Sequence, residues 1–203
     1  MSLRQLIFAE GLRCIDAMQH AVYAAHKTRL LGGLHGTVVE VGPGTGLNLA
    51  YLNRDVTYIG LEPNRHLHAR IRAQMRTHGI GGRVLEASVE AEVLPPQSAD
   101  VVISTLVLCS VSNVAAALAS IQRVLRPGGR FVFIEHIAAE DHSWPRLVQE
   151  GITPLWHRCF DGCHPNRATD HAIRQAGFQE VAMTHFSVGV PVIRPHCAGY
   201  AVA

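Results

Sequence analysis

The sequence predicts an α/β fold in which a doubly wound, mostly parallel sheet of seven strands carries helices on both faces. From residue 37 to residue 135, strand-like and helix-like segments alternate and are joined by short loops, which is the pattern of parallel β-α-β units. A glycine-rich loop follows the first of these strands and opens a helix-like segment. Two further β-rich segments close the chain after the alternation ends. Five alternating units and two closing strands give a Rossmann-like sheet of seven strands.

Each element is predicted from its periodicity and from the residues that interrupt it. The first thirty residues carry apolar side chains near helical spacing, and Gly32-Gly33 ends this helix. Pro127-Gly128-Gly129 ends the helix expected at 113–125. The segment 144–161 contains two prolines and follows no single period. Strands are expected at 37–41, 56–61, 83–85, 100–109, 130–135, 178–188 and 197–202, and further helices at 47–52, 64–77 and 113–125.

Composition and charge exclude several classes of protein. Hydrophobic residues make up 48% of the 203 residues and charged residues 17%, which argues against disorder. A net charge of +2 argues against nucleic-acid binding by bulk charge, and the arginines around the 64–77 helix fit a solvated face. Residues 101–121 carry no charge, but their serines and Asn113 indicate a buried strand and a capped helix, so no stable membrane insertion is expected.

The first residues and the cysteines predict a cytoplasmic protein. Arg4, Glu10 and Arg13 interrupt what would be the apolar core of a signal peptide. The five cysteines are an odd number scattered through a chain that needs no cross-links, so we expect reduced thiols.

The sharpest local feature is the loop Gly42-Pro43-Gly44-Thr45-Gly46, which follows a strand and opens a helix-like segment. Its G-x-G-x-G spacing places Leu47 where a dinucleotide fingerprint would place its last glycine. Glu40 precedes the loop, and Glu62 ends the second strand at the position where a carboxylate accepts ribose hydroxyls. A carboxylate beside the loop attracts an ammonium group and repels a pyrophosphate. The pattern therefore favours S-adenosylmethionine over NAD, with a ligand-free corner and a non-catalytic sensor as the alternatives.

The same motifs resemble those of class I S-adenosylmethionine-dependent methyltransferases. The match covers Glu40 to Gly46, Glu62, Glu90-Ala91, 100–111 and 124–129. A narrower resemblance to the methyltransferase-like family seven proteins, which are thiol S-methyltransferases in animals, covers residues 20 to 203. It rests on residues 105–111, Glu135-His136, Trp156-His157, 160–163, 194–196 and 199–202. The chain departs from that family in carrying Pro43 for cysteine and Glu62 for aspartate, and we expect no counterpart of the family's hydrophobic membrane anchor.

No linker interrupts the sequence, so we expect one domain, 1–203. The apolar stripe of the first helix needs a partner, so residues 1–33 are expected to be a helical lid over the cofactor, with 34–136 as the cofactor-binding half and 137–203 as the substrate-side half. The resemblance implies a cofactor site along the carboxyl ends of the strands. Glu62 would hold the ribose with Pro63 beside it, and Glu90 and Ala91 would meet the adenine. The methionine part would be surrounded by Glu40, Gly42, Gly44, Gly46 and Asn48, and the floor near the sulfonium would be Thr105 and Leu106.

For the acceptor side, we expect a small molecule, most favourably a thiol. A thiol has a pKa near 8.5 and is partly ionised at neutral pH, so it needs only modest activation. His136, Asp161 and His196 are the expected catalytic residues, and Cys109 and Arg194 the expected pocket residues. His157, Cys159, Cys163 and His164 lie close together in sequence, but four ligands from one short segment fit a tetrahedral ion poorly, so no metal is expected.

Two other functions remain open at this point. One is an N- or C-methyltransferase acting on a phospholipid headgroup, a quinone or another small metabolite. The other is a module that binds S-adenosylmethionine without catalysis. The sequence predicts neither the oligomeric state nor the natural acceptor.

Overall fold

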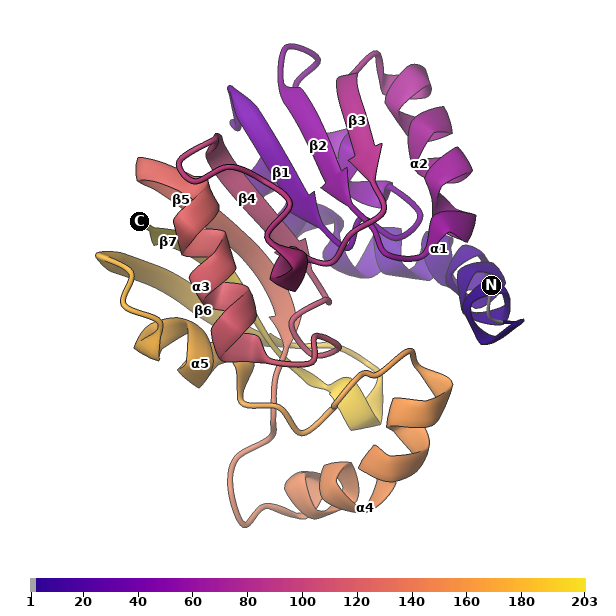
Figure 1. The fold of residues 1–203 in the computed structure, drawn as a ribbon. Coiled ribbons are helices and arrows are strands. Elements are labelled where there is room, and N and C mark those ends of the chain that lie inside the picture. Colours follow the sequence, from indigo (N-terminus) through magenta and orange to yellow (C-terminus); the bar gives the residue numbers. More distant parts are fainter. Residues whose placement is uncertain (1–2) are drawn as a thin grey trace.

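The computed structural model describes the backbone of residues 3–203 and the side chains of residues 5–203. Its centre is one seven-stranded sheet with the order β3-β2-β1-β4-β5-β7-β6 (Figure 1). Strands β1 to β5 are parallel, whereas β7 pairs antiparallel with both β5 and β6. The predicted doubly wound, mostly parallel sheet is thereby confirmed. The strands are β1 (Thr37–Val41), β2 (Thr57–Leu61), β3 (Gly81–Leu85), β4 (Ala99–Thr105), β5 (Leu125–His136), β6 (Glu180–Ser187) and β7 (Pro195–Val202).

Helices cover both faces of the sheet. On one face lie α1 (Leu3–Leu31), α2 (Arg65–His78) and the short 3-10 helix η1 (Leu47–Tyr51); on the other lie α3 (Val114–Val124) and α5 (Thr169–Gln175). Helix α4 (Trp144–Cys159) lies beyond the carboxyl ends of the parallel strands (Figure 1). Two further 3-10 turns are η2 (Val89–Ala91), between β3 and β4, and η3 (Pro191–Ile193), between β6 and β7.

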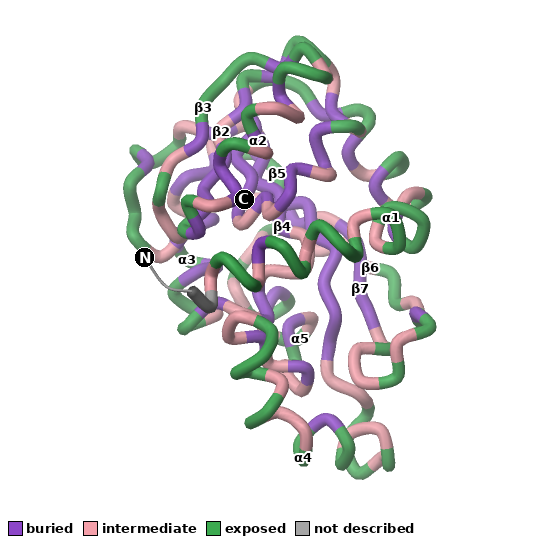
Figure 2. The backbone as a smooth tube through the Cα atoms, turned by 90° about the vertical axis from the view of Figure 1, so that its right-hand side faces the viewer, coloured by how far each residue is buried: buried purple, intermediate pink, exposed green. Residues whose placement is uncertain are grey.

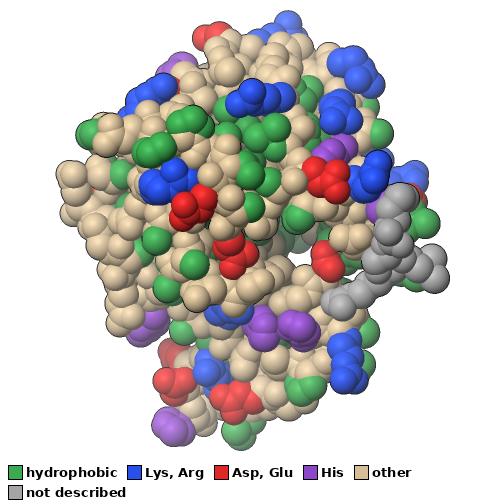
Figure 3. Space-filling model, viewed as in Figure 1, with side chains coloured by type: hydrophobic (Ala, Val, Ile, Leu, Met, Phe, Trp, Pro, Cys, Tyr) green, Lys and Arg blue, Asp and Glu red, His purple; other side chains and the backbone are tan. Residues whose placement is uncertain are grey.

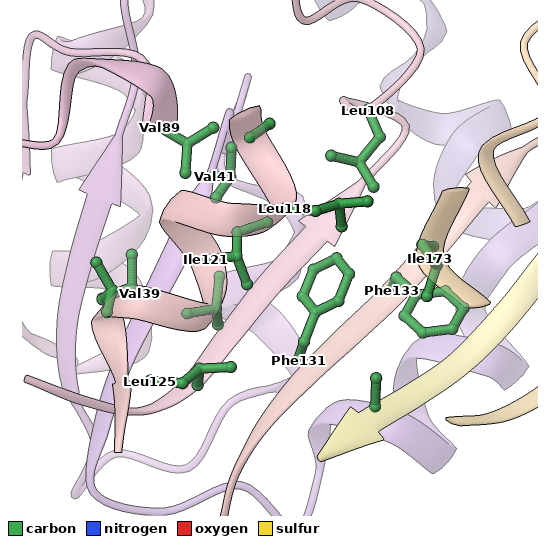
Figure 4. Close-up of a cluster of buried hydrophobic side chains, with 14 of the residues drawn as sticks. Val39, Val41, Val89, Leu108, Leu118, Ile121, Leu125, Phe131, Phe133 and Ile173 are labelled. Carbon is green, nitrogen blue, oxygen red and sulfur yellow. The ribbon is translucent and has the colours of Figure 1, made fainter. Parts of the chain in front are cut away.

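The core is divided by the sheet because successive strand residues point to opposite faces. Val39, Val102 and Phe131 pack toward α3 and α5, whereas their neighbours Val38 and Val101 pack toward α1 and α2. Figure 4 shows the first of these clusters, with Leu118 and Ile121 of α3 facing Phe131 and Phe133 of β5. The backbone trace shows the central strands as mostly buried, whereas α1 and α4 carry long exposed stretches (Figure 2).

Several segments differ from the sequence prediction, among them helix α5, which was not predicted, and β5, which begins at Leu125 rather than at residue 130. Within 47–52, residues Leu47–Tyr51 form a short 3-10 helix rather than an α-helix, and Gly46 precedes it in the left-handed conformation with φ 82°. The fourth strand ends at Thr105, since Leu106 has a φ of 57°, which no strand residue adopts. The segment without a clear period is helix α4, in which Pro145 occupies the first turn, where no backbone donor is needed, and Pro154 lies inside.

Candidate active site

The glycine loop lies between β1 and η1, at the carboxyl edge of the sheet and beside the point where the strand order reverses. This is where open α/β sheets bind ligands. Gly42, Gly44 and Gly46 all have positive φ, which only glycine adopts freely. A Cβ on Gly42 would lie 2.8 Å from Cγ2 of Val107, so this position also needs glycine for the close approach of the loop that follows β4.

Glu40 and Asn48 form a buried polar pair behind the glycine loop. Glu40 Oε1 accepts a 2.7 Å hydrogen bond from Asn48 Nδ2, and Oε2 accepts one from the Tyr58 hydroxyl. Burial raises the pKa of Glu40, although these two hydrogen bonds and the charge of Lys27 oppose the shift. Asn48 Oδ1 is buried and has no partner among the described residues. A buried acceptor of this kind is costly unless a ligand satisfies it, and an ammonium group would do so.

Glu62 follows β2 and faces the same loop. Its Oε2 accepts from Gly44 N at 3.0 Å, and its Oε1 accepts from Asn64 N at 2.8 Å. Burial raises its pKa from 4.5 to about 7, with smaller contributions from the charges of Asp161 and Glu40. A carboxylate with free lone pairs at this position suits a pair of hydroxyl donors.

The predicted adenine side is only partly assembled. Glu90 accepts a 2.8 Å hydrogen bond from the backbone of Asn113, the residue that caps α3, so its carboxylate already supports that helix. Pro63 and Ala91 are exposed. These three positions remain predictions for the cofactor, and no described contact joins them to the glycine loop.

The predicted floor lies at the end of β4. Thr105 Oγ1 accepts from Asn48 Nδ2 at 3.0 Å, which ties the floor to the glycine loop, and Leu106 turns the chain with its left-handed backbone. Beneath it is Glu135, which the sequence analysis did not select. Glu135 is fully buried and bonds Ser104 Oγ at 2.6 Å through Oε1, but its Oε2 has no partner among the described residues. Its place at the end of a strand and the Glu135-His136 motif of the narrower resemblance are the signals that could have indicated it.

The acceptor side contains a buried group that the sequence analysis did not assemble. Cys109 was expected at the end of the fourth strand but lies in the loop beyond it, because the strand ends early. Its thiol, His136 Nε2 and the Cys163 thiol all lie within 4.8 Å of one another, and each residue is buried. Cys163 Sγ is 3.2 Å from His136 Nε2 and accepts from Trp156 Nε1 at 3.3 Å. Hydrogen bonding from Cys109 and from His136 lowers the pKa of Cys163.

His196, expected to be catalytic, and Arg194, expected in the substrate pocket, differ sharply in burial. His196 is fully buried, and its Nε2 is 2.8 Å from the Tyr23 hydroxyl of α1. Burial lowers its pKa to about 4, so it is uncharged at neutral pH. Arg194 is exposed and meets His196 only through its backbone carbonyl, which accepts from His196 Nδ1 at 3.3 Å.

Asp161 lies in the left-handed turn after α4, with a φ of 47°. Its charge helps to raise the pKa of Glu62, so the turn that carries it faces the cofactor half across the carboxyl edge. In the space-filling view a hollow separates the sheet from the segment around α4, with histidine side chains on the lower rim and acidic ones above (Figure 3).

Helix α1 lies directly against the glycine loop. Asp16 accepts from Thr45 Oγ1 at 2.7 Å and from Arg70 Nη2 at 2.7 Å, and so joins α1 to the loop and to α2. Leu12 is the nearest side chain to the space above Gly44. Lys27 of α1 is 2% exposed, and its charge acts on Glu40 and Asp16.

Comparisons with known proteins identify the family. The methyltransferase domain model matches residues 39–133. Human thiol S-methyltransferase TMT1A is 36% identical over 171 residues, which cover 82% of this chain and 70% of that protein. The chain belongs to the S-adenosylmethionine-dependent methyltransferases. Mouse thiol S-methyltransferase TMT1B is 37% identical over 183 residues, which cover 88% of this methyltransferase and 74% of the mouse protein.

Solved structures agree on the fold of this methyltransferase. A SAM-dependent methyltransferase from Thermotoga maritima superposes with a TM-score of 0.66 at 18% identity, over 95% of this chain and 93% of that one. Within residues 3–203, no helix has both the length and the apolar character needed to cross a membrane.

Proposed function

We propose that this methyltransferase transfers the methyl group of S-adenosylmethionine to the sulfur of a small thiol. The observation that carries this proposal is the identity of 34–37% to thiol S-methyltransferases over most of the chain. The buried thiol and imidazole groups at the acceptor side support it, because they are soft and polarisable neighbours for a sulfur substrate.

The residues around the glycine loop fit the cofactor. Asn48 Oδ1, which lacks a partner among the described residues, and the Glu40 carboxylate beside it would receive the ammonium group of the methionine part. Glu62 would accept the ribose hydroxyls, and the backbone of Gly42, Gly44 and Gly46 would allow close approach. When bound, the cofactor supplies an activated methyl group on a sulfonium.

The acceptor side of the chain would bind and ionise the thiol rather than remove its proton with a strong base. Methyl transfer is an in-line displacement, so alignment of acceptor and donor carries much of the catalysis. His136 and the thiols of Cys109 and Cys163, in the segments after β4 and α4, are buried within 4.8 Å of one another and would offer the acceptor sulfur a space shielded from water. Asp161, from the facing turn, would close this space on the cofactor side.

Purified full-length protein should convert a small alkyl thiol to its methyl thioether in the presence of S-adenosylmethionine. The assay follows S-adenosylhomocysteine and the thioether by mass spectrometry, with an amine, a phenol and a quinone as parallel acceptors. Methylation of one of these instead of any thiol would reject the thiol acceptor and keep the methyltransferase. Binding of S-adenosylhomocysteine with no turnover of any acceptor would favour the non-catalytic alternative.

The cellular location is a separate part of the proposal. We infer a cytoplasmic protein, which the five unpaired cysteines support. Cell fractionation at moderate salt should leave it with the soluble proteins, and recovery with membranes would contradict this.

A further inference from the structure

The cluster of Cys109, His136 and Cys163 is built from three segments that are distant in sequence. Cys109 comes from the loop after β4, His136 from the last position of β5, and Cys163 from the turn after α4. Their exposed fractions are 2%, 3% and 8%. Two buried thiols and a buried imidazole whose reactive atoms converge within 4.8 Å form a ligand set typical of a soft or borderline metal ion.

The two cysteine segments are fastened to each other by the backbone. His164 N donates to Cys109 O at 2.9 Å, and Arg167 Nη1 donates to Leu108 O at 2.7 Å and to Val111 O at 2.8 Å. The carbonyls of the loop that carries Cys109 are therefore held by residues that directly follow Cys163. The two sulfurs are positioned by this scaffold and not by flexible surface loops.

The distances suit a tetrahedral ion after a small adjustment. Bonds of about 2.3 Å to sulfur and about 2.0–2.1 Å to nitrogen separate tetrahedral ligand atoms by roughly 3.5–3.8 Å. His136 Nε2 and Cys163 Sγ are 3.2 Å apart, and all three ligand atoms lie within 4.8 Å of one another. The pair at 3.2 Å would have to separate by about 0.4 Å, and a pair at the 4.8 Å limit would have to approach by about 1 Å, which side-chain rotations supply.

The surroundings also resemble those of a metal centre. Trp156 Nε1 donates to Cys163 Sγ at 3.3 Å, which is the kind of hydrogen bond that tunes a ligating thiolate. Two thiolates balance the charge of a divalent cation, so the loaded cluster would be neutral in a buried place. Two other cysteines do not join the cluster. Cys197 is also buried but lies within β7, and Cys159 is close to Cys163 in sequence but is exposed.

We propose that Cys109, His136 and Cys163 bind a zinc-class divalent cation and that the sulfur of the acceptor thiol takes its fourth position. Three protein ligands with one open position are the arrangement of catalytic zinc sites. The second half of this proposal rests on the proposed thiol methylation. The sequence prediction of no metal was based on Cys163 together with its sequence neighbours His157, Cys159 and His164. In the structure, the possible co-ligands of Cys163 are instead Cys109 and His136, which come from distant segments.

The chemical step balances with the groups named. Ligation of the acceptor to the cation releases the thiol proton to solvent and leaves a thiolate. The thiolate sulfur forms a bond to the methyl carbon while the bond from that carbon to the sulfonium sulfur breaks, and the bonding electron pair stays on the donor sulfur. The product thioether carries no charge, is a weaker ligand than a thiolate, and leaves the cation free.

Cobalt(II) tests the site directly, because it takes tetrahedral zinc positions and reports on them by absorption. Reduced, chelator-treated full-length protein should bind Co(II) with thiolate-to-cobalt charge-transfer bands and intense visible bands of a tetrahedral ion, and Zn(II) should displace it. A small alkyl thiol added without cofactor should strengthen the charge-transfer bands. Cys109→Ser and Cys163→Ser should each weaken Zn(II) binding by more than the ~10–100-fold typical of losing an outer-shell partner.

Cys159→Ser is the matched control, since it removes an exposed cysteine from the segment that carries Cys163. Its spectra should equal those of the wild type. A second measurement needs no variant: Zn(II) should protect Cys109 and Cys163 of the wild type from alkylation, as located by mass spectrometry, while Cys14 and Cys159 still react. Absence of tetrahedral Co(II) bands, bands that survive in both serine variants, or no protection of the two buried thiols would overturn the site.

The two proposals fail in distinguishable ways. Thiol methylation at an unchanged rate by chelator-treated, metal-free protein, or Co(II) bands unaffected by an added thiol, would reject the fourth-position role and leave the proposed function standing. A tetrahedral Co(II) site that responds to thiols, in a protein that methylates only amines or phenols, would reject the proposed function and keep the metal site.

Discussion

At the scale of single residues, burial determines the chemistry of Glu62. The side chain is 5% exposed, and its two oxygens accept backbone hydrogen bonds from Gly44 and Asn64. If the ribose hydroxyls also bind there, Glu62→Ala removes contacts to a charged group worth about 1.5–3 kcal/mol. We expect the affinity for S-adenosylhomocysteine to fall by roughly ten- to a hundredfold in calorimetric titration.

The matched control for this variant is Glu86→Ala. Glu86 follows β3 at the same edge of the sheet, but its side chain is exposed. Its loss should leave the affinity unchanged. If Glu62→Ala also binds like the wild type while its melting temperature stays within a few degrees, Glu62 is no part of the cofactor site.

The raised pKa of Glu62 also predicts how stability depends on pH. The folded state holds the proton up to about pH 7, whereas the unfolded chain releases it near the ordinary value of 4.5. The contribution of the group to stability is therefore complete below pH 4.5 and is lost as the pH rises through about 7. Its size is on the order of 3 kcal/mol. In melting curves across this range without ligand, Glu62→Gln should remove that loss of stability, and an unchanged slope would contradict the assignment.

Several residue-level expectations could be reached from the sequence because they depend on local backbone. The positive φ of Gly42, Gly44 and Gly46 follows from a glycine loop between a strand and a helical turn. Hydrogen bonds between side chains that tertiary structure brings together could not be predicted from the sequence. Neither the Tyr58 hydroxyl on Glu40 nor the Tyr23 hydroxyl on His196 has any sequence signal, because the partners are 18 and 173 residues apart.

At the scale of elements, α1 is the segment whose position bears most on the cofactor. It was predicted as a lid from its apolar stripe alone, and in the structure Asp16 joins it to Thr45 of the glycine loop and to Arg70 of α2. Asp16→Ala leaves these donors without their acceptor but removes no apolar contact. A loss of about 0.5–1.5 kcal/mol in cofactor binding, or roughly two- to tenfold in affinity, is expected if α1 covers the site.

Glu10→Ala is the control on the same helix. Among the described side chains, Glu10 pairs only with Arg13 at the exposed surface. Its loss should therefore change neither affinity nor melting temperature beyond the small effect of a surface ion pair. Equal affinities for the wild type and both variants, measured by calorimetry with S-adenosylhomocysteine, would mean that α1 is not a lid. A fall in melting temperature without a fall in affinity would give it a purely structural role.

The ends of elements were harder to predict than the elements themselves. The strand predicted at 100–109 is longer than β4, because the apolar residues continue past Thr105. The left-handed backbone of Leu106 marks where the strand stops. Helix α4 was not predicted, since Pro145 and Pro154 hide its periodicity. Its position beyond the sheet edge is set by tertiary contacts that no local pattern encodes.

At the scale of the whole molecule, the sheet gathers into one place groups that the sequence keeps far apart. The parallel arrangement of β1, β4 and β5 was predictable from alternation and short loops, and with it the edge of the sheet along which Thr105 and His136 end their strands. Cys163 was not predictable as their neighbour. It reaches His136 through the connection of α4, which leaves the sheet after β5 and returns to it by way of α5.

This gathered site predicts how the rate of thiol methylation depends on pH. The reacting species is the bound thiolate, so kcat for a small alkyl thiol, which reports the enzyme–substrate complex, should rise with pH to a plateau. The midpoint of this rise should lie below the free thiol's pKa of about 8.5. His136→Ala should move the midpoint upward, because the bound anion loses a favourable neighbour.

His196 and Asp161 should behave differently from His136 in the same experiment. His196 is uncharged, with a pKa lowered to about 4, so His196→Ala should lower the rate through lost packing with Tyr23 and leave the midpoint in place. Asp161→Ala should lower the midpoint if the carboxylate only repels the thiolate, because removing a negative neighbour favours the anion. The measurement is thioether formation from pH 6 to pH 10, a range chosen to bracket roughly the free thiol's pKa, for the wild type and the three variants. A midpoint at the free thiol's value in all four proteins would show that the chain aligns the acceptor without ionising it, and would remove His136 from the activation of the thiol.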